Sequence, residues 1–431
     1  MSRHQHDRRH FLKRSLLLPP LVYTATHAGE HLLQAQVAVP KQPDFDVLIR
    51  GGRVVDASQN LSAESDVAIL RGKIARIAPR IEGKAWYNLD ARGKVVTPGL
   101  VDVHVHVYDG VAPLGIPADP NCIAKGVTTV LDAGSSGANT FPGFRNYVMR
   151  VVDTRVYALL NISIVGQSTI TTGYQHGELI DLRYANAKLA IRTIEENRDR
   201  ILGIKIRMSR NITGGNDLRA LAIAREAADA VQLPLMVHIG NSHSPVPDIM
   251  AMLKKGDVIT HSFRGGEGGI IDDRDRVLPA VRQAVERGVH LDVGHGAGSF
   301  SFRTAEKLLP QGVAPGTISS DVHQFNVNGP VFDLATTLSK FLHLGMSLEE
   351  TLKRATLNPA RTFAFPEGTG SIKPGSTADV AIFDLREGRF ELTDSLGEKR
   401  TGNLKLIPVA TLKAGRIYGN SRIPVTPIAE G

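Results

Sequence analysis

Two histidines, His104 and His106, stand one residue apart in the segment "VTPGLVDVHVHVYDG", whose β-branched and apolar residues are typical of a buried strand. Side chains at i and i+2 of a strand point the same way, about 7 Å apart, so both imidazoles enter one small volume. Neutral imidazoles can share a cation there, because histidine nitrogen is a common ligand of Zn²⁺. The alternative is a pair of core histidines whose nitrogens are satisfied by backbone carbonyls.

Four further polar residues stand at or near the ends of other apolar runs. Lys205 lies within "GIKIR", His238 ends "PLMVH", His261 ends "VITH" and Asp321 ends "TISSD". The isoleucines beside Lys205 occupy the opposite face of its strand, so its amine points inward, where an unpaired ammonium is costly. Each residue alone has a structural explanation, such as an ion pair, a satisfied interior histidine or a helix cap. Their joint occurrence favours one shared site over coincidence.

The elements that must position these residues alternate between strand and helix. Between residues 98 and 363, apolar runs are separated by amphipathic segments such as "DLRALAIAREAADAV". The eight expected strands are "LVDVHVHV", "GVTTVLDAG", "RVYALLNISIVG", "ILGIKIRMS", "PLMVHIGNS", "DVITHSFRG", "HLDVGHGAG" and "GTISSDVHQ". This alternation predicts an α/β fold, a (β/α)₈ TIM barrel, in which the carboxyl ends of the strands form the reactive rim.

Both ends of the chain outside the barrel have a different sequence pattern. Residues 40–97 and 364–431 contain short alternating strands broken by glycine pairs, as in "FDVLIRGGRVVD" and "LIPVATLKAGRIYG". These segments predict a small β-sandwich built from both chain ends, with the barrel (98–363) inserted between them.

Residues 1–39 resemble an export signal. The basic stretch 8–13, "RRHFLK", is similar to a twin-arginine motif and precedes a short apolar segment interrupted by prolines. We therefore expect an exported, periplasmic protein; a basic tail without a targeting role is the alternative. The apolar segment is too short for a membrane-spanning helix.

Composition and charge limit the kinds of molecule that the protein is expected to bind. The 431 residues carry a net charge of +8, of which residues 1–39 contribute +3, and no basic cluster with interleaved aromatics occurs elsewhere. Nucleic-acid binding is therefore not expected. The single cysteine, Cys122, excludes an intramolecular disulfide. We expect a small-molecule substrate, and the sequence leaves a homo-oligomer open.

Together, the split β-layer, "PGLVDVHVH", "GIKIR", "ATLNPAR" and "GSIKPGSTADV" resemble the amidohydrolase superfamily of metal-dependent hydrolases, over nearly the whole chain after residue 39. "GVTTVLDAGSSGANTFPGFR" and "MVHIGN" are similar to a deacetylase-type subgroup related to dihydroorotases and hydantoinases. The resemblance implies two divalent metal ions, expected to be Zn²⁺. Their ligands would be His104, His106, Lys205 as N6-carboxylysine, His238, His261 and Asp321.

The resemblance also implies a mechanism. A metal-bridging hydroxide would attack the carbonyl of an amide or ester, and Asp321 would carry the proton to the leaving atom. The residues with the right position to contact a small N-acyl or O-acyl substrate are His295, Arg207, Asn326 and Asn328. For Arg207 an internal ion pair is an equal alternative, and His295 could equally orient a loop through its backbone neighbours. The glycines of "RGGEGG" and "GHGAG" are expected to form flexible segments at the rim.

Two other functions stay open. The first is a cyclic amidase of the dihydroorotase or hydantoinase type, although those dihydroorotases place an arginine soon after the paired histidines, where this chain has Val107-Tyr108-Asp109. The second is an inactive barrel used for assembly. A barrel that had lost its activity should have lost ligands, whereas here all six are present.

Overall fold

The computed structural model describes residues 42–171, 174–175, 177–418 and 422–427. All but residue 42 belong to one compact unit that begins at Pro43. The expected export signal, residues 1–39, lies outside the described residues. None of the described helices is long and apolar enough to cross a membrane.

A curled parallel sheet forms the wall of the barrel, in the order β14-β13-β12-β11-β8-β7-β6. Its apolar side chains are buried because the sheet is covered on both faces. The strands are β6 (Leu100–Val105), β7 (Val127–Gly137), β8 (Arg155–Asn161), β11 (Ile201–Arg207), β12 (Leu235–His238), β13 (Val258–Thr260) and β14 (His290–Leu291).

The eighth expected strand is not a regular strand. Residues 317–322 close the ring through isolated parallel bridges, Asp292 to Thr317 on one side and Val105 to Val322 on the other. The interruption lies at Asp321, whose backbone is left-handed with φ of +48°, a conformation that no extended ladder accommodates. Its backbone N–H instead donates to the His104 carbonyl at 2.6 Å, which fastens this segment to β6.

Helices connect and cover the strands. The longest, α5 (Asp217–Val231), packs on β11 and β12 and buries alanines and apolar residues at helical spacing, from Ala220 to Val231. The other α-helices are α1 (Ala118–Asn121), α2 (Phe141–Phe144), α3 (Ala187–Glu195), α4 (Arg210–Thr213), α6 (Val246–Ala251), α7 (Pro279–Glu286), α8 (Phe302–Leu308), α9 (Leu334–His343), α10 (Leu348–Lys353) and α11 (Leu357–Thr362). Short η turns and the ribbon β9 (Ile170–Thr171) and β10 (Tyr174–Gln175) lie in the loops.

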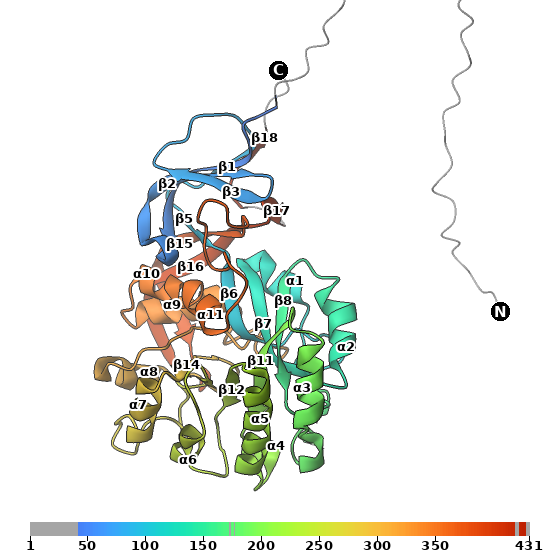
Figure 1. The fold of residues 1–431 in the computed structure, drawn as a ribbon. Helices are drawn as coiled ribbons and strands as arrows, with labels where there is room; N and C mark the ends of the chain where they lie inside the picture. The colour runs from blue at the N-terminus through green and yellow to red at the C-terminus, as the bar shows by residue number, and fades with distance from the viewer. Residues whose placement is uncertain (1–41, 172–173, 176, 419–421, 428–431) are drawn as a thin grey trace, which may run out of the picture. The chain divides into compact units, whose positions relative to one another are not determined.

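A second sheet joins the two ends of the chain, as Figure 1 shows in blue and red. Its central strand β1 is bent: the first half pairs with β4 and the second half with β5, both in parallel. Residues from both branches enclose one apolar core, as expected for a small β-sandwich. The strands are β1 (Phe45–Asp56), β2 (Leu61–Leu70), β3 (Lys73–Ala78), β4 (Ala85–Asp90), β5 (Val95–Pro98), β15 (Val380–Thr393), β16 (Lys399–Lys413), β17 (Arg416–Tyr418) and β18 (Val425–Pro427).

The turn between β15 and β16 reaches back to the barrel. The Asp394 carboxylate accepts the Phe302 N–H at 3.0 Å, and Ser395 N–H donates to the Phe300 carbonyl at 3.1 Å. The smaller domain therefore supports the loop after β14 directly.

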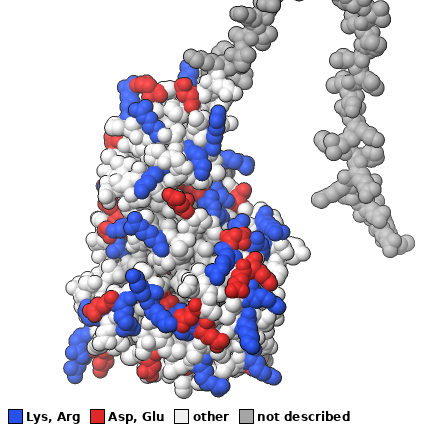
Figure 2. Space-filling model, viewed as in Figure 1, with Lys and Arg blue, Asp and Glu red and all other residues white. Residues whose placement is uncertain are grey.

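Basic and acidic side chains are interspersed on the face of the molecule in Figure 2. This face shows no continuous basic surface of the kind that follows a nucleic-acid backbone.

Candidate metal centre

The paired histidines at the end of β6 are held by hydrogen bonds from behind. His104 Nδ1 lies 2.8 Å from Thr260 Oγ1, whose single proton goes to Asp292 Oδ2, also at 2.8 Å. The hydroxyl must therefore accept from His104 Nδ1–H, so the lone pair of this ring is on Nε2. His106 Nδ1 lies 2.9 Å from Ser135 Oγ, which leaves its Nε2 facing the barrel interior as well.

His238, the last residue of β12, and His261, which follows β13, face one another. His261 Nδ1 donates to the Gly294 carbonyl at 2.6 Å, so its lone pair is also on Nε2. That Nε2 lies 2.8 Å from His238 Nδ1, while His238 Nε2 contacts Ser209 Oγ at 2.9 Å. Two ring nitrogens thus point into one space.

Lys205, within β11, is fully buried at 0% exposure. Its Nζ lies 3.1 Å from His104 Nε2, and no carboxylate among the described residues lies within ion-pair distance. Burial lowers the pKa of Lys205 to about 7. Its stem passes so close to Gly134 that a Cβ there would stand 2.7 Å from Lys205 Cγ.

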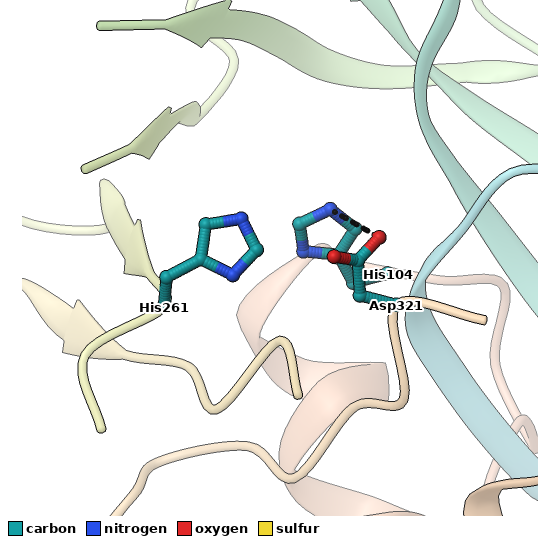
Figure 3. A group of neighbouring side chains, drawn as sticks. All are labelled: His104, His261 and Asp321. Carbon is teal, nitrogen blue, oxygen red and sulfur yellow. Dashed lines mark ion pairs between the residues drawn. The ribbon is translucent and has the colours of Figure 1, made fainter. Parts of the chain in front are cut away.

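Asp321 comes from the irregular closing segment and completes the cluster. Its Oδ1 lies 3.4 Å from His104 Nε2 and 3.2 Å from His106 Nε2, and it is buried without a hydrogen-bond partner among the described side chains. One ligand atom each of His104, His261 and Asp321 lies within 4.8 Å of the others. Figure 3 shows these three side chains directed toward one another. The left-handed backbone of Asp321 and of His261, with φ of +69°, aims these side chains inward.

Electrostatics keep the rings neutral. Burial, the largest cause, lowers the pKa of His106 and of His261 to about 3, and it holds the pKa of His104 and His238 well below the usual range. Neutral imidazole is the form that binds a metal. An orphaned carboxylate oxygen facing several imidazole lone pairs is a donor set that fits a divalent cation.

The structure thus brings together His104, His106, Lys205, His238, His261 and Asp321. The four residues expected to contact the substrate do not share one environment. Arg207 forms a bidentate ion pair with the buried Glu178, at 3.0 Å for both hydrogen bonds, so the internal ion pair considered above is present. Asn326 donates to the Asp321 carbonyl at 2.8 Å and supports the closing segment, whereas Asn328 is exposed. His295 is fully buried against Lys340.

The expectation that "GHGAG" is a flexible segment is wrong for its first half. Gly294 and Gly296 are buried and have positive φ of +47° and +55°. A Cβ on Gly296 would stand 2.4 Å from Asp321 Oδ2, and one on Gly294 would stand 2.9 Å from His261 Nδ1. These glycines allow the loop after β14 to pass directly behind two ligands.

This close approach gives a prediction. Gly296→Ala should lower turnover at least about tenfold and cost about 1–3 kcal/mol of stability, because a side chain at positive φ is strained and displaces Asp321. Gly298→Ala is the matched control, since a Cβ there meets nothing within 4 Å. Turnover and thermal unfolding of the two variants check this prediction. Equal turnover of the two variants would show that the close approach of Gly296 to Asp321 does not matter for catalysis.

Several residues that hold the histidines in place were not predicted from the sequence. Thr260 and Asp292 hold His104, Ser135 holds His106 and Ser209 holds His238. The available signal was the small polar residues at the strand ends, as in "VITH" and "HLDVGHG".

Comparisons with known proteins identify relatives of this chain. Residues 95–417 match the amidohydrolase family. A deacetylase of Enterococcus faecalis is 37% identical over 384 residues, which cover 88% of this chain and 100% of the relative. A crystal structure of an adenine deaminase has a TM-score of 0.81 at 37% identity and covers 88% of this chain and 100% of that one. A crystal structure of a dihydroorotase has a TM-score of 0.79 at 31% identity, with coverage of 87% and 99%.

Proposed function

Because the chain belongs to the amidohydrolase family, a family of hydrolases acting on amide bonds, we propose that it is a binuclear metal-dependent deacetylase. Its substrates would be small N-acyl or O-acyl compounds, with cleavage of an amide or ester bond. The observation that carries the proposal is Asp321 Oδ1, a buried carboxylate oxygen without a hydrogen-bond partner that faces the Nε2 atoms of His104 and His106.

The side chains of this cluster suit two divalent ions, for which Zn²⁺ is our expectation. His104, His106 and Asp321 would hold the inner ion, and His238 and His261 the outer one. Lys205 would bridge both as N6-carboxylysine: its neutral amine adds CO₂ and releases one proton, which turns a buried amine into an anionic ligand with two oxygens. When bound, such ions supply an activated water near neutral pH and polarise the substrate carbonyl.

The other steps belong to the side chains of the chain. Asp321 takes the proton of the attacking water and delivers it to the leaving nitrogen or oxygen, because its Oδ1 faces the cluster and has no competing donor. The hydrogen bonds behind His104 and His261 fix the tautomers of these two rings, so each keeps its Nε2 lone pair toward the cluster.

A cyclic amidase on the same scaffold is the second candidate, and the solved dihydroorotase relative is the observation that favours it. The residues after the paired histidines argue against it. Tyr108 is buried and its hydroxyl donates to the Thr140 carbonyl at 2.9 Å, while Asp109 is exposed. Neither supplies the cation that would hold a substrate carboxylate there.

A substrate panel separates these functions. We expect Zn²⁺-loaded protein to release acetate from N-acetyl or O-acetyl small molecules and to leave cyclic ureides intact. Ring opening without deacetylation would favour the cyclic amidase. No turnover of either class, with metal bound, would favour the inactive barrel.

Metal removal gives a further prediction. Dialysis against a chelator should abolish turnover, and added Zn²⁺ should restore it, because a bound metal ion would lower the pKa of the attacking water and polarise the substrate carbonyl. Elemental analysis before and after dialysis measures the stoichiometry, expected to be two ions per chain. Full turnover in metal-free protein would contradict the metal-dependent mechanism.

We also propose that residues 1–39 direct export. Replacing both Arg8 and Arg9 with lysine should retain the protein in the cytoplasm, because charge is kept while the guanidinium pair is lost. Fractionation of the producing cells, with mass measurement of the exported form, checks this. An untrimmed wild-type chain found only in the cytosol would favour the basic tail without a targeting role.

A further inference from the structure

A second buried lysine lies outside the metal cluster. Lys340, in α9, is 0% exposed, yet none of the described carboxylates forms an ion pair with it. Its Nζ contacts His295 Nε2 at 2.6 Å and the Pro330 carbonyl at 3.0 Å, and it lies 6.0 Å from the centre of the Phe300 ring. Burial of an amine with neutral partners is unfavourable, so this residue requires an explanation beyond packing.

His295, the partner of Lys340, is held on every side. Its ring stacks on Phe300 with centroids 4.7 Å apart, and its Nδ1 lies 3.0 Å from the Gly296 carbonyl. The Ser395 hydroxyl, from the turn of the smaller domain, lies 3.1 and 2.9 Å from the carbonyls of His295 and Gly296, which share its single proton. Since Nδ1–H faces a carbonyl, the lone pair of Nε2 accepts from the Lys340 amine.

The two groups that Lys340 contacts belong to the two loops that flank Asp321. The loop after β14 is joined to the closing segment by the hydrogen bonds His295 N–H to Ser319 carbonyl, 3.2 Å, and Gly296 N–H to Ser320 carbonyl, 3.0 Å. On the other side, Gly329 N–H donates to the Asn326 carbonyl at 2.9 Å, and the Asn326 amide donates to the Asp321 carbonyl at 2.8 Å. One amine therefore connects both supports of the Asp321 backbone.

We propose that Lys340 and His295 are positioning residues that set the Asp321 carboxylate against the metal cluster without touching it. This inference rests on the proposed role of Asp321. It explains why a buried amine is retained between two loops, and why the turn of the smaller domain extends to His295. In this role the Lys340 amine donates two hydrogen bonds, and no covalent bond forms or breaks.

The test is a double-variant cycle with Lys340→Met, His295→Phe and both together. We expect each single variant to lower kcat about 10- to 100-fold with KM changed less than about twofold, because a small displacement of a catalytic group affects the chemical step more than binding. The double variant should be no worse than the more damaging single one, because the two act as a unit. Additive losses, or an unchanged kcat, would overturn the proposal.

Ser339→Ala is the matched control, because Ser339 directly precedes Lys340 in α9 and its Oγ accepts the Leu406 N–H at 3.0 Å. It should lower stability while kcat is unchanged. Should Lys340→Met not fold, His295→Phe and His295→Gln give the same test, with partial recovery of kcat expected only for the glutamine, which can still accept from Lys340.

A readout independent of turnover separates this inference from the proposed function. The visible absorption spectrum of Co²⁺-loaded protein reports the ligand geometry, and we expect Lys340→Met to alter it while Ser339→Ala does not. If wild type binds Co²⁺ but hydrolyses nothing, the proposed function fails and the spectrum still decides the positioning role. Wild type that binds no Co²⁺, or variants with the wild-type spectrum, would overturn the inference.

Discussion

Asp321→Asn should lower kcat by about 10²–10⁴-fold while the protein keeps its fold and most of its metal. Oδ1 of Asp321 lies 3.2 Å from His106 Nε2 and has no hydrogen-bond partner of its own among the described side chains, so it is free to receive a proton. An asparagine oxygen can still ligate a cation, but an amide cannot accept and release a proton near neutral pH. Ligation and proton transfer are thereby separated.

The matched control is Asp109→Asn, the same chemical change at an exposed aspartate close to the paired histidines. Its turnover should equal that of wild type. Both variants require turnover at saturating substrate together with elemental analysis, because metal loss would imitate loss of the proton step. Turnover of Asp321→Asn within about tenfold of wild type would assign the proton transfer elsewhere, and His323, whose ring lies 6.2 Å from that of His106, would be the next residue to test.

The convergence of the histidines and Asp321 was predictable because a parallel barrel obeys a simple rule. All strands run the same way, so side chains at their carboxyl ends converge whatever their separation in the chain. His104 and His261 are more than 150 residues apart, yet their ring centroids lie 5.0 Å apart. The alternation of apolar runs with amphipathic helices was enough to place these histidines at the same rim. The alternating residues at the two chain ends were enough to predict the second sheet.

The partners of these residues were not predictable in the same way. Glu178, which pairs with Arg207, lies in a loop between β10 and α3, where no periodic pattern fixes the backbone. The closing segment likewise carries the apolar and polar residues of a strand, but the left-handed conformation of Asp321 depends on hydrogen bonds with distant loops. The tight packing of Gly296 against Asp321 follows from the same tertiary contacts, and for that reason a glycine-rich stretch resembled a flexible one.

The other large effect is expected for Lys205→Ala, which should remove most of the bound metal and reduce turnover to near background. As N6-carboxylysine, Lys205 would add a second negative charge beside that of Asp321 and offset the repulsion between two cations. The amine is 0% exposed and lies 3.1 Å from His104 Nε2. Without Lys205, Asp321 is the one acidic residue left in the proposed ligand set.

Two variants separate the anion from the bulk of the side chain. Lys205→Met retains most of the volume beside Gly134 and should lose metal as Lys205→Ala does, whereas Lys399→Ala, at an exposed lysine, should lose none. Since carboxylation consumes CO₂, bicarbonate during expression should raise metal occupancy in wild type and have no effect on either Lys205 variant. Circular dichroism shows whether the barrel is intact, and elemental analysis gives the occupancy. Unchanged metal in a folded Lys205→Met protein would contradict a bridging carboxylysine, because the thioether offers no anion that could replace it.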